Sequence, residues 1–215
     1  MRLYAITDRR LLAGPHSPGL LTDEERAGLV QMAGEWAALG VEYVQLREKD
    51  LNGPELTMLV TEMAAAIRQP AGARRPQLLL NAGSPDAWEV ARLPGVDGLH
   101  LPGKWSPEQV GRARIRCLVS VGCHSVEEVA VAGVAGADLA LLSPIFQTES
   151  HPEARPLGLE RLDQAVHAAG EMPVFALGGV DEAKAADCLA RGAAGVAGIR
   201  TFLSGRWTSH TERAS

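Results

Sequence analysis

Cysteine is scarce in this chain. The three cysteines, Cys117, Cys123 and Cys188, are an odd number and form no Cys-x-x-Cys pair. A disulfide framework or a structural zinc site needs paired cysteines at suitable spacing, so neither is indicated. We expect each cysteine to be a small buried hydrophobic side chain.

Long apolar runs and basic runs are also missing. No stretch approaches the roughly 18 uncharged residues of a membrane span, and the N-terminal MRLYAITDRR lacks the apolar region of a signal peptide. The formal net charge is -5 without a cluster of Lys or Arg, which argues against a nucleic-acid partner. We expect a cytoplasmic protein that binds small molecules and neither membrane nor nucleic acid, while homo-oligomerisation is left open.

No linker rich in Pro, Gly or Ser divides the 215 residues, and 46% of them are hydrophobic, which is ample for one large core. We therefore expect residues 1–205 to form a single domain. The polar segment 206–215 is expected to be a C-terminal tail.

Short β-rich runs alternate with helical patterns along the whole chain. These runs are nearly continuously apolar, which is typical of strands covered by helices on both faces. They are RLYAIT, VEYVQLR, PQLLLN, VDGLHL, CLVSVG, DLALLS, PVFALG and AGVAGI.

A weak internal repeat supports the same organisation. The segments LGVEYVQL, PGVDGLHL, AGADLALL and RGAAGVAGI each place glycine at an expected helix end, just before a strand. Repeated β-α units with parallel strands form either a doubly wound sheet or a closed barrel. Eight units favour the α/β class with a single (β/α)8 TIM barrel.

Several expected helices begin with a capping residue. Thr22 and Ser125 each precede an acidic residue by three positions, which predicts capping boxes. Ser84 and Ser106 stand directly before a proline suited to the first helical position, and Asp181 follows the segment GGV. These residues predict where five helices begin.

In such a barrel the carboxyl ends of the strands form the reactive mouth, where polar residues gather. Gln45, Arg47 and Lys49 occupy alternate positions of the second run, so they share one face of a strand. Two cations and an amide suit an anionic ligand. The alternative is that Lys49 only reaches water and Arg47 pairs with a carboxylate. Asn81 ends the third run, where it could bond a substrate.

Glycines follow the last two strands, in ALGGV at 176–180 and GIRTF at 198–202. The loops after strands seven and eight are the usual phosphate site of this fold, and glycine lets backbone N–H groups approach an anion. The predicted phosphate-binding residues are Gly178, Gly179, Gly198, Ile199 and Arg200. Alternatively, the glycines only form tight turns and Arg200 is a surface charge.

A series of segments follows the order of a known family along nearly the whole chain. The segments are LYAITD at 3–8, VQLREKD at 44–50, LLLN at 78–81, DGLHL at 97–101, HSVEEV at 124–129, SPIFQTESHP at 143–152, PLGLERL at 156–162, PVFALGGV at 173–180 and AGVAGI at 194–199. In them the chain resembles thiamine phosphate synthase and its relative, the thiazole tautomerase TenI. The resemblance implies a single β/α barrel that binds a phosphorylated thiazole.

For the synthase, the resemblance implies that a pyrimidine diphosphate is held with magnesium and attacked by the nitrogen of a thiazole phosphate, releasing pyrophosphate. Magnesium prefers carboxylate ligands, and the family places one aspartate at each of two positions that hold Ala82 and Trp105 here. Gly122 and His151 also replace a serine and a lysine of the family pattern.

These departures favour the tautomerase over the synthase. The resemblance then implies that the chain binds a thiazole carboxylate phosphate and shifts a proton to aromatise the ring, with His124 as the acid/base group. It also implies substrate contacts from Thr148, Ser150 and His151. We expect no metal and no other cofactor. The alternatives are the synthase itself and a non-catalytic protein that binds a phosphorylated ligand or regulates.

Overall fold

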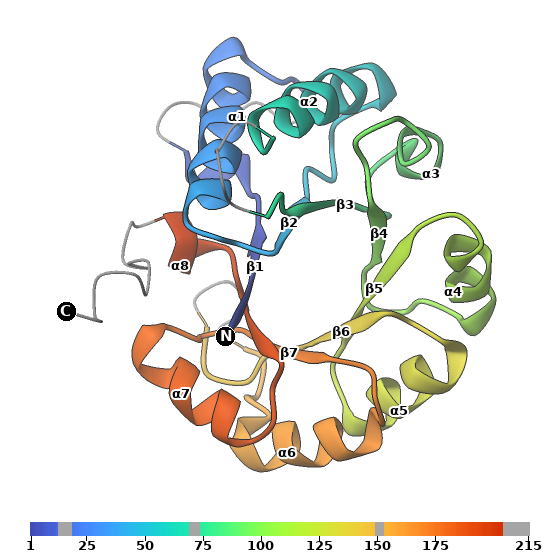
Figure 1. Cartoon of the computed structure of the whole chain (residues 1–215), viewed down its shortest axis with the longest axis vertical. Coiled ribbons are helices and arrows are strands. Elements are labelled where there is room, and N and C mark those ends of the chain that lie inside the picture. The colour runs from blue at the N-terminus through green and yellow to red at the C-terminus, as the bar shows by residue number, and fades with distance from the viewer. Residues whose placement is uncertain (13–18, 69–73, 149–152, 204–215) are drawn as a thin grey trace.

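The computed structural model describes residues 1–12, 19–68, 74–148 and 153–203. Eight parallel strands follow one another in chain order and close into a barrel, with β1 paired to β8 through Arg2 and Gly195. Figure 1 shows this ring of strands with the helices outside it. The predicted single (β/α)8 barrel is confirmed, and the doubly wound sheet is excluded. The strands are β1 (Arg2–Ile6), β2 (Tyr43–Leu46), β3 (Gln77–Asn81), β4 (Gly98–Leu101), β5 (Leu118–Cys123), β6 (Leu139–Leu142), β7 (Val174–Leu177) and β8 (Gly195–Gly198).

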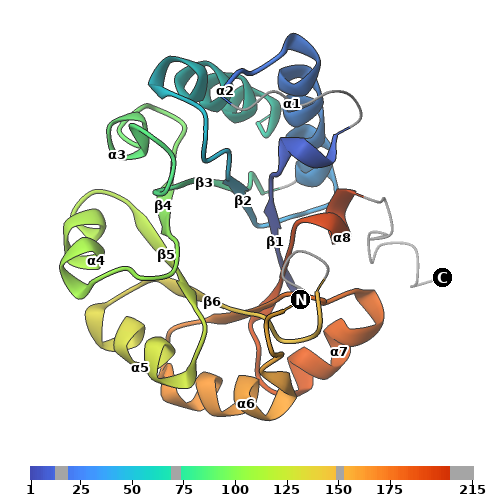
Figure 2. The same ribbon diagram turned by 180° about the vertical axis from the view of Figure 1, so that it is seen from behind.

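A helix follows each strand, and the view from behind shows the same outer ring (Figure 2). A single 3-10 turn, η1 (Arg9–Leu11), comes between β1 and the first α-helix. The α-helices are α1 (Asp23–Ala38), α2 (Gly53–Ala66), α3 (Ala87–Val90), α4 (Pro107–Arg114), α5 (Val126–Ala135), α6 (Gly158–Ala168), α7 (Glu182–Ala190) and α8 (Arg200–Leu203).

Three of the predicted helix starts are confirmed. The Thr22 and Ser106 side chains accept hydrogen bonds from backbone N–H groups three residues later, and both sites form complete capping boxes. The Asp181 carboxylate accepts from the N–H of Lys184. Each cap satisfies a donor that the first helical turn leaves without a partner.

A fourth start, at Ser125, is also confirmed but without the predicted capping box, and the fifth, at Ser84, is wrong. Ser125 caps α5, but Glu128 completes no capping box because its carboxylate accepts from the backbone N–H of His124 instead. Ser84 does not begin a helix: its hydroxyl donates to the carbonyl of Glu48, and α3 begins three residues later, after Asp86 in a left-handed conformation. A tertiary contact therefore replaces the local cap at Ser84.

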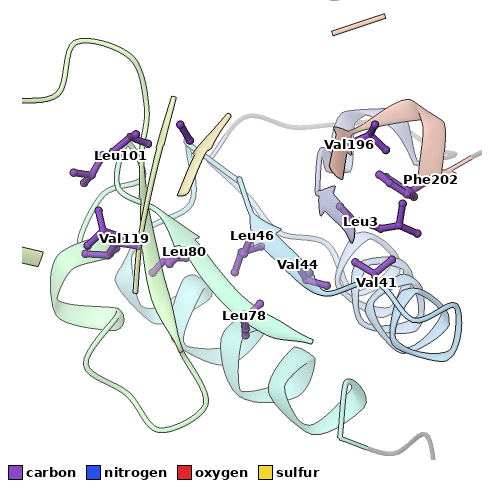
Figure 3. Packing of buried hydrophobic residues seen from close by; sticks show 14 of the residues in the cluster. Leu3, Val41, Val44, Leu46, Leu78, Leu80, Leu101, Val119, Val196 and Phe202 are labelled. Carbon is purple, nitrogen blue, oxygen red and sulfur yellow. The ribbon is translucent and has the colours of Figure 1, made fainter. Parts of the chain in front are cut away.

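The strands sort their side chains into two apolar clusters because alternate residues face opposite sides of the barrel wall. The inner cluster includes Tyr4, Tyr43 and Phe175, whose rings lie 5.5–5.9 Å apart between centroids. The larger outer cluster fills the space between strands and helices (Figure 3). Trp36 of α1 is 1% exposed and lies in that outer cluster.

Of the three cysteines, Cys123 and Cys188 are buried and Cys117 is partly buried, and none forms a disulfide. No α-helix in the described part of the chain is both long and apolar enough to span a bilayer. The predicted tail at 206–215 lies outside the described residues.

Gly195 provides a test of barrel packing. A Cβ there would lie 2.1 Å from the carbonyl oxygen of Arg2 on the paired strand and 2.8 Å from the Phe175 ring. We expect Gly195→Ala to lower the free energy of unfolding by about 1–3 kcal/mol or more, because an inserted methyl group must displace backbone. Urea unfolding monitored by circular dichroism measures this change.

Gly111 is the matched control, since a Cβ at this position of α4 meets nothing within 4 Å. Gly111→Ala is expected to raise the free energy of unfolding by about 0.5–1 kcal/mol through helix propensity. Equal stability of the Gly195→Ala variant and the unmodified protein would refute the close approach.

Candidate active site at the barrel mouth

The predicted site residues of the described chain lie at or just beyond the carboxyl ends of the strands. Gln45 is in β2, Asn81 is the last residue of β3, and His124 directly follows β5. Strand β2 is shorter than predicted, ending at Leu46, so Arg47 and Lys49 belong to the following loop.

The loop after β2 is held in place by Glu48, which lies between the two cations in sequence. Its carboxylate accepts from the Thr7 hydroxyl at 2.7 Å and from the backbone N–H of Arg9 at 3.2 Å. The Thr7 hydroxyl oxygen in turn accepts from the N–H of Arg47 at 2.9 Å. Burial raises the pKa of Glu48 to about 7, although these hydrogen bonds and the Arg9 charge act in the opposite direction. Glu48 was not predicted as a site residue, and it fixes the segment that carries both cations.

Arg47 and Lys49 bring positive charge to the mouth. The Arg47 guanidinium lies 3.9 Å from the Asp8 carboxylate, which is itself bound by Arg10 at 2.6 Å. This distant contact resembles the alternative in which Arg47 pairs with a carboxylate, but Arg10 is the closer partner. Desolvation lowers the pKa of Lys49, and the Arg47 and Arg10 charges lower it further. The charges of Arg47 and Arg10 act unfavourably on the Lys49 ammonium, and an anionic ligand between these cations would offset that repulsion.

Gln45 and Asn81 are 1% exposed and bond each other: the Asn81 amide N donates to Gln45 Oε1 at 3.0 Å. Gln45 Nε2 donates to the Tyr4 hydroxyl at 2.9 Å. The structure therefore brings together two of the predicted substrate-binding residues. It adds Tyr4, which was not predicted.

His100 in β4 is 6% exposed, and its Nδ1 lies 2.9 Å from the Ser120 hydroxyl oxygen. Burial, with smaller effects of the Arg47 and Lys49 charges, lowers the pKa of His100 to about 3. The imidazole is therefore neutral at pH 7. Neither His100 nor Ser120 was predicted as a site residue, although both occupy inward-facing positions of strands that alternate with period two.

His124 lies on the exposed side of the mouth. Its Nδ1 is 2.8 Å from the backbone carbonyl oxygen of Ser143, which can only accept, so Nδ1 carries the proton. The Nε2 atom lies 2.9 Å from where a Cβ on Gly103 would be. In the neutral ring, Nε2 is therefore the unprotonated nitrogen, and this hydrogen-bond acceptor lies beside Gly103 in the loop after β4. The structure places His124 where it was predicted, and its catalytic role stays a prediction.

Gly178 and Gly179 follow β7 with φ angles of 93° and 64°. A Cβ on Gly179 would lie 2.3 Å from the Gln147 carbonyl oxygen, so the close approach of the loop after β6 requires glycine. Their carbonyl oxygens accept from the Phe146 N–H and the Lys184 ammonium. The geometry of the turn therefore accounts for both glycines. Their backbone N–H groups are the donors that this turn could direct at a phosphate.

The remaining predicted residues of the described chain lie after β6 or at the end of β8 and beyond it. Gly198 ends β8, Ile199 packs partly buried against the inner cluster, and exposed Arg200 begins α8. Thr148 is half-buried after β6. Their predicted phosphate and substrate contacts stay predictions, and Ser150 and His151 lie outside the described residues.

A magnesium site of the kind implied by the resemblance does not fit this mouth. Ala82 follows Asn81, and the Trp105 indole N–H donates to the Gly122 carbonyl oxygen at 2.9 Å. Glu48 turns away toward Thr7 and Arg9. Within the ranges that the model describes, no three His, Cys, Asp or Glu side chains are grouped closely enough to hold a metal ion.

Comparison with known proteins identifies what the chain resembles as a whole. Residues 19–202 match a family model described as thiamine monophosphate synthase. The protein "Putative thiamine-phosphate synthase 2" of Aquifex aeolicus is 38% identical over 203 residues, covering 94% of this chain and 97% of that protein. The thiamine-phosphate synthase of Methanoculleus marisnigri is 34% identical over 94% of this chain and 87% of its own length.

Among solved structures, thiamine phosphate pyrophosphorylase from Pyrococcus furiosus aligns with a TM-score of 0.72 and 26% identity, covering 92% of this chain and 85% of that one. These relatives contradict the expected thiazole tautomerase, and nothing in them points to TenI in particular. The expectation was wrong because it took the missing carboxylates at Ala82 and Trp105 as evidence for a different reaction. A missing metal ligand excludes one way to bind charge and does not by itself indicate proton transfer.

The low pKa of His100 predicts acid sensitivity of the fold. Below pH 6.5 the unfolded chain binds a proton at this histidine while the folded chain does not until about pH 3, so stability is lost as pH falls through this window. From pH 7 to pH 5 the unmodified protein should lose about 2 kcal/mol more unfolding free energy than His100→Asn.

Chemical denaturation at the two pH values measures this difference. His167→Asn is the matched control, because the His167 side chain is 78% exposed and should leave the pH dependence almost unchanged. An identical pH dependence in His100→Asn and the unmodified protein would show that His100 titrates normally.

Proposed function

Because the chain belongs to the thiamine monophosphate synthase family, we propose that it is a thiamine-phosphate synthase, joining a pyrimidine diphosphate to a thiazole phosphate with release of pyrophosphate. The observation that carries this proposal is the similarity to synthases over nearly the full length of both chains. The repulsion of Lys49 by Arg47 and Arg10 supports it, since both substrates are anionic and would offset that repulsion.

The reaction forms one bond and breaks another. The thiazole nitrogen attacks the methylene carbon of the pyrimidine, and the carbon–oxygen bond to the diphosphate breaks, with its electron pair leaving on pyrophosphate. Negative charge therefore develops at the diphosphate, where preorganised cations stabilise the transition state. This step transfers no proton, so it needs no acid/base role for His124.

In this proposal the two phosphorylated substrates are bound by different residues of the mouth. Arg47 and Lys49 bind the diphosphate, on a loop that Glu48 holds in place. The N–H groups of Gly178 and Gly179 bind the thiazole phosphate. Because Ala82 and Trp105 supply no metal ligand, the side-chain cations are the positive charges that the described mouth offers to the leaving group.

The test is release of pyrophosphate from pyrimidine diphosphate plus thiazole phosphate, run once with magnesium and once with a chelator. We expect release that depends on both substrates. Absence of release under both conditions, with a folded protein, would refute the proposed function.

Replacing the cations tests how the diphosphate is bound. Arg47→Gln and Lys49→Met should each lower kcat/KM roughly 10- to 100-fold, because each removes a charge-assisted interaction worth about 1.5–3 kcal/mol. Steady-state pyrophosphate release measures the effect.

Arg161→Gln is the matched control, because this side chain on α6 is exposed and donates to Gln164 of the same helix. It should leave kcat/KM unchanged. Equal activity in Arg47→Gln, Lys49→Met and Arg161→Gln would remove the loop after β2 from the diphosphate site.

A further inference from the structure

A belt of hydrogen bonds runs through the barrel interior across five consecutive strands, and we name it the polar belt. The Asn81 amide bonds Gln45 at 3.0 Å, Gln45 bonds Tyr4 at 2.9 Å, Tyr4 bonds Ser120 at 3.4 Å, and Ser120 bonds His100 at 2.9 Å. All five residues are buried. The Tyr4–Ser120 contact is the longest and therefore the weakest of the four.

One backbone group sets the orientation of both amides in the polar belt. The N–H of Gly83 can only donate, and it bonds Asn81 Oδ1 at 2.9 Å. The Asn81 Nδ2 group must then face Gln45, and it donates to Gln45 Oε1. Gln45 Nε2 is thereby directed at the Tyr4 hydroxyl oxygen, which accepts.

The same direction continues to the histidine. The Tyr4 hydroxyl, which accepts from Gln45, donates to Ser120, and this leaves the Ser120 proton available for Nδ1 of His100 at 2.9 Å. In this arrangement the neutral imidazole carries its proton on Nε2. The amide orientations, which are usually ambiguous for Asn and Gln, are fixed here by a donor that cannot be reversed.

The protonated Nε2 lies next to the site already described. It is 3.5 Å from where a Cβ on Gly122 would be, and the Gly103 backbone N is 3.3 Å from the same point. Because Gly122 has no side chain, no Cβ occupies this point next to the nitrogen. Arg47 and Lys49 are near enough for their charges to act on His100.

We propose that the polar belt fixes His100 as the Nε2–H tautomer, which makes His100 a specificity-determining hydrogen-bond donor for an acceptor atom of the pyrimidine diphosphate. The contact with this ligand rests on the proposed function, whereas the tautomer is a property of the ligand-free protein. His124, with its proton on Nδ1, presents an acceptor to the same loop after β4. The two histidines thus offer opposite hydrogen-bonding groups to the mouth.

The tautomer is tested by NMR of ligand-free protein labelled with 15N-histidine, because protonated and unprotonated ring nitrogens have well-separated 15N shifts. We expect His100 to show a protonated Nε2 and an unprotonated Nδ1 at pH 7. His100→Asn assigns the signals by their disappearance. A protonated Nδ1 in the unmodified protein would overturn the proposal.

Asn81→Asp gives the sharpest test, because a carboxylate can only accept. Gln45 would then turn to donate to position 81, Tyr4 would donate to Gln45, Ser120 to Tyr4, and His100 to Ser120 through Nδ1–H. The expected result is a reversed His100 tautomer, and an unchanged tautomer in the folded variant would overturn the proposal.

Ser120→Ala covers the case in which Asn81→Asp fails to fold. Without the Ser120 hydroxyl, Nδ1 loses its donor, and the 15N shifts should indicate a mixture of both tautomers. Full retention of the Nε2–H form in folded Ser120→Ala would show that the polar belt does not set the tautomer.

Ligand contact is tested by adding inorganic pyrophosphate, the unphosphorylated pyrimidine alcohol or the intact pyrimidine diphosphate to the labelled protein. A change in the His100 Nε2 shift that is lost in Ser120→Ala supports the donor role. The first two probes distinguish a phosphate oxygen from a ring nitrogen as the acceptor. No change with any of the three would overturn the contact.

These outcomes separate the inference from the proposed function. A correct tautomer and ligand-induced shift without pyrophosphate release would refute the synthase and leave the donor role intact. Pyrophosphate release by a protein whose His100 is the Nδ1–H tautomer would support the synthase and refute the donor role of His100.

Discussion

Closure of the barrel imposes the constraint from which the site follows. Each strand must turn alternate side chains into one narrow interior, and the parallel register brings inward residues of neighbouring strands to similar heights. Tyr4, Tyr43 and Phe175 fill the lower part with stacked and edge-on rings. Two residues further along β2 and β3, the inward positions hold Gln45 and Asn81. Tyr4 belongs to both levels, because its ring packs below while its hydroxyl joins the polar belt.

Much of the fold could be predicted from the sequence because it is determined locally. Apolar runs, glycines before strands and the caps at Thr22, Ser106 and Asp181 are read within a few residues, and the barrel follows from counting β-α units. Ser84 shows the limit of this approach. Its hydroxyl bonds the Glu48 carbonyl, a partner 36 residues away that no local pattern indicates.

The sequence predicted where the candidate site lies, but it predicted only some of the residues that form it. Gln45, Asn81 and His124 stand at strand ends, where the fold places reactive groups. Glu48 and Ser120 were missed because their roles depend on partners brought together by closure: Glu48 bonds Thr7 in the segment after β1, and Ser120 lies between Tyr4 and His100. Inward alternation in β1 and β5 was a signal that could have pointed to Tyr4 and Ser120. The direction of the hydrogen bonds required coordinates.

The two substitutions at Ala82 and Trp105 predicted the wrong reaction, although the position of the candidate site in the barrel was predicted correctly. Ala82 and Trp105 show which acids are missing, but the retained cations at Arg47 and Lys49 still suit an anionic substrate. Similarity over the whole chain outweighs two differences at the mouth, because binding energy there comes from several groups together. The missing carboxylates therefore bear on how the charge of an anionic ligand is offset, and the relatives bear on which reaction is performed.

The indole hydrogen bond of Trp105 has a consequence for how this barrel could change over evolutionary time. An aspartate at position 82 alone would place a partly buried carboxylate against the outer apolar cluster, while an aspartate at position 105 alone would leave the Gly122 carbonyl without its indole donor. Each replacement is unfavourable in the absence of the other, so their effects would not be additive. In a lineage that carries this tryptophan, a pair of carboxylates for a metal ion therefore requires two substitutions, each of which is unfavourable alone.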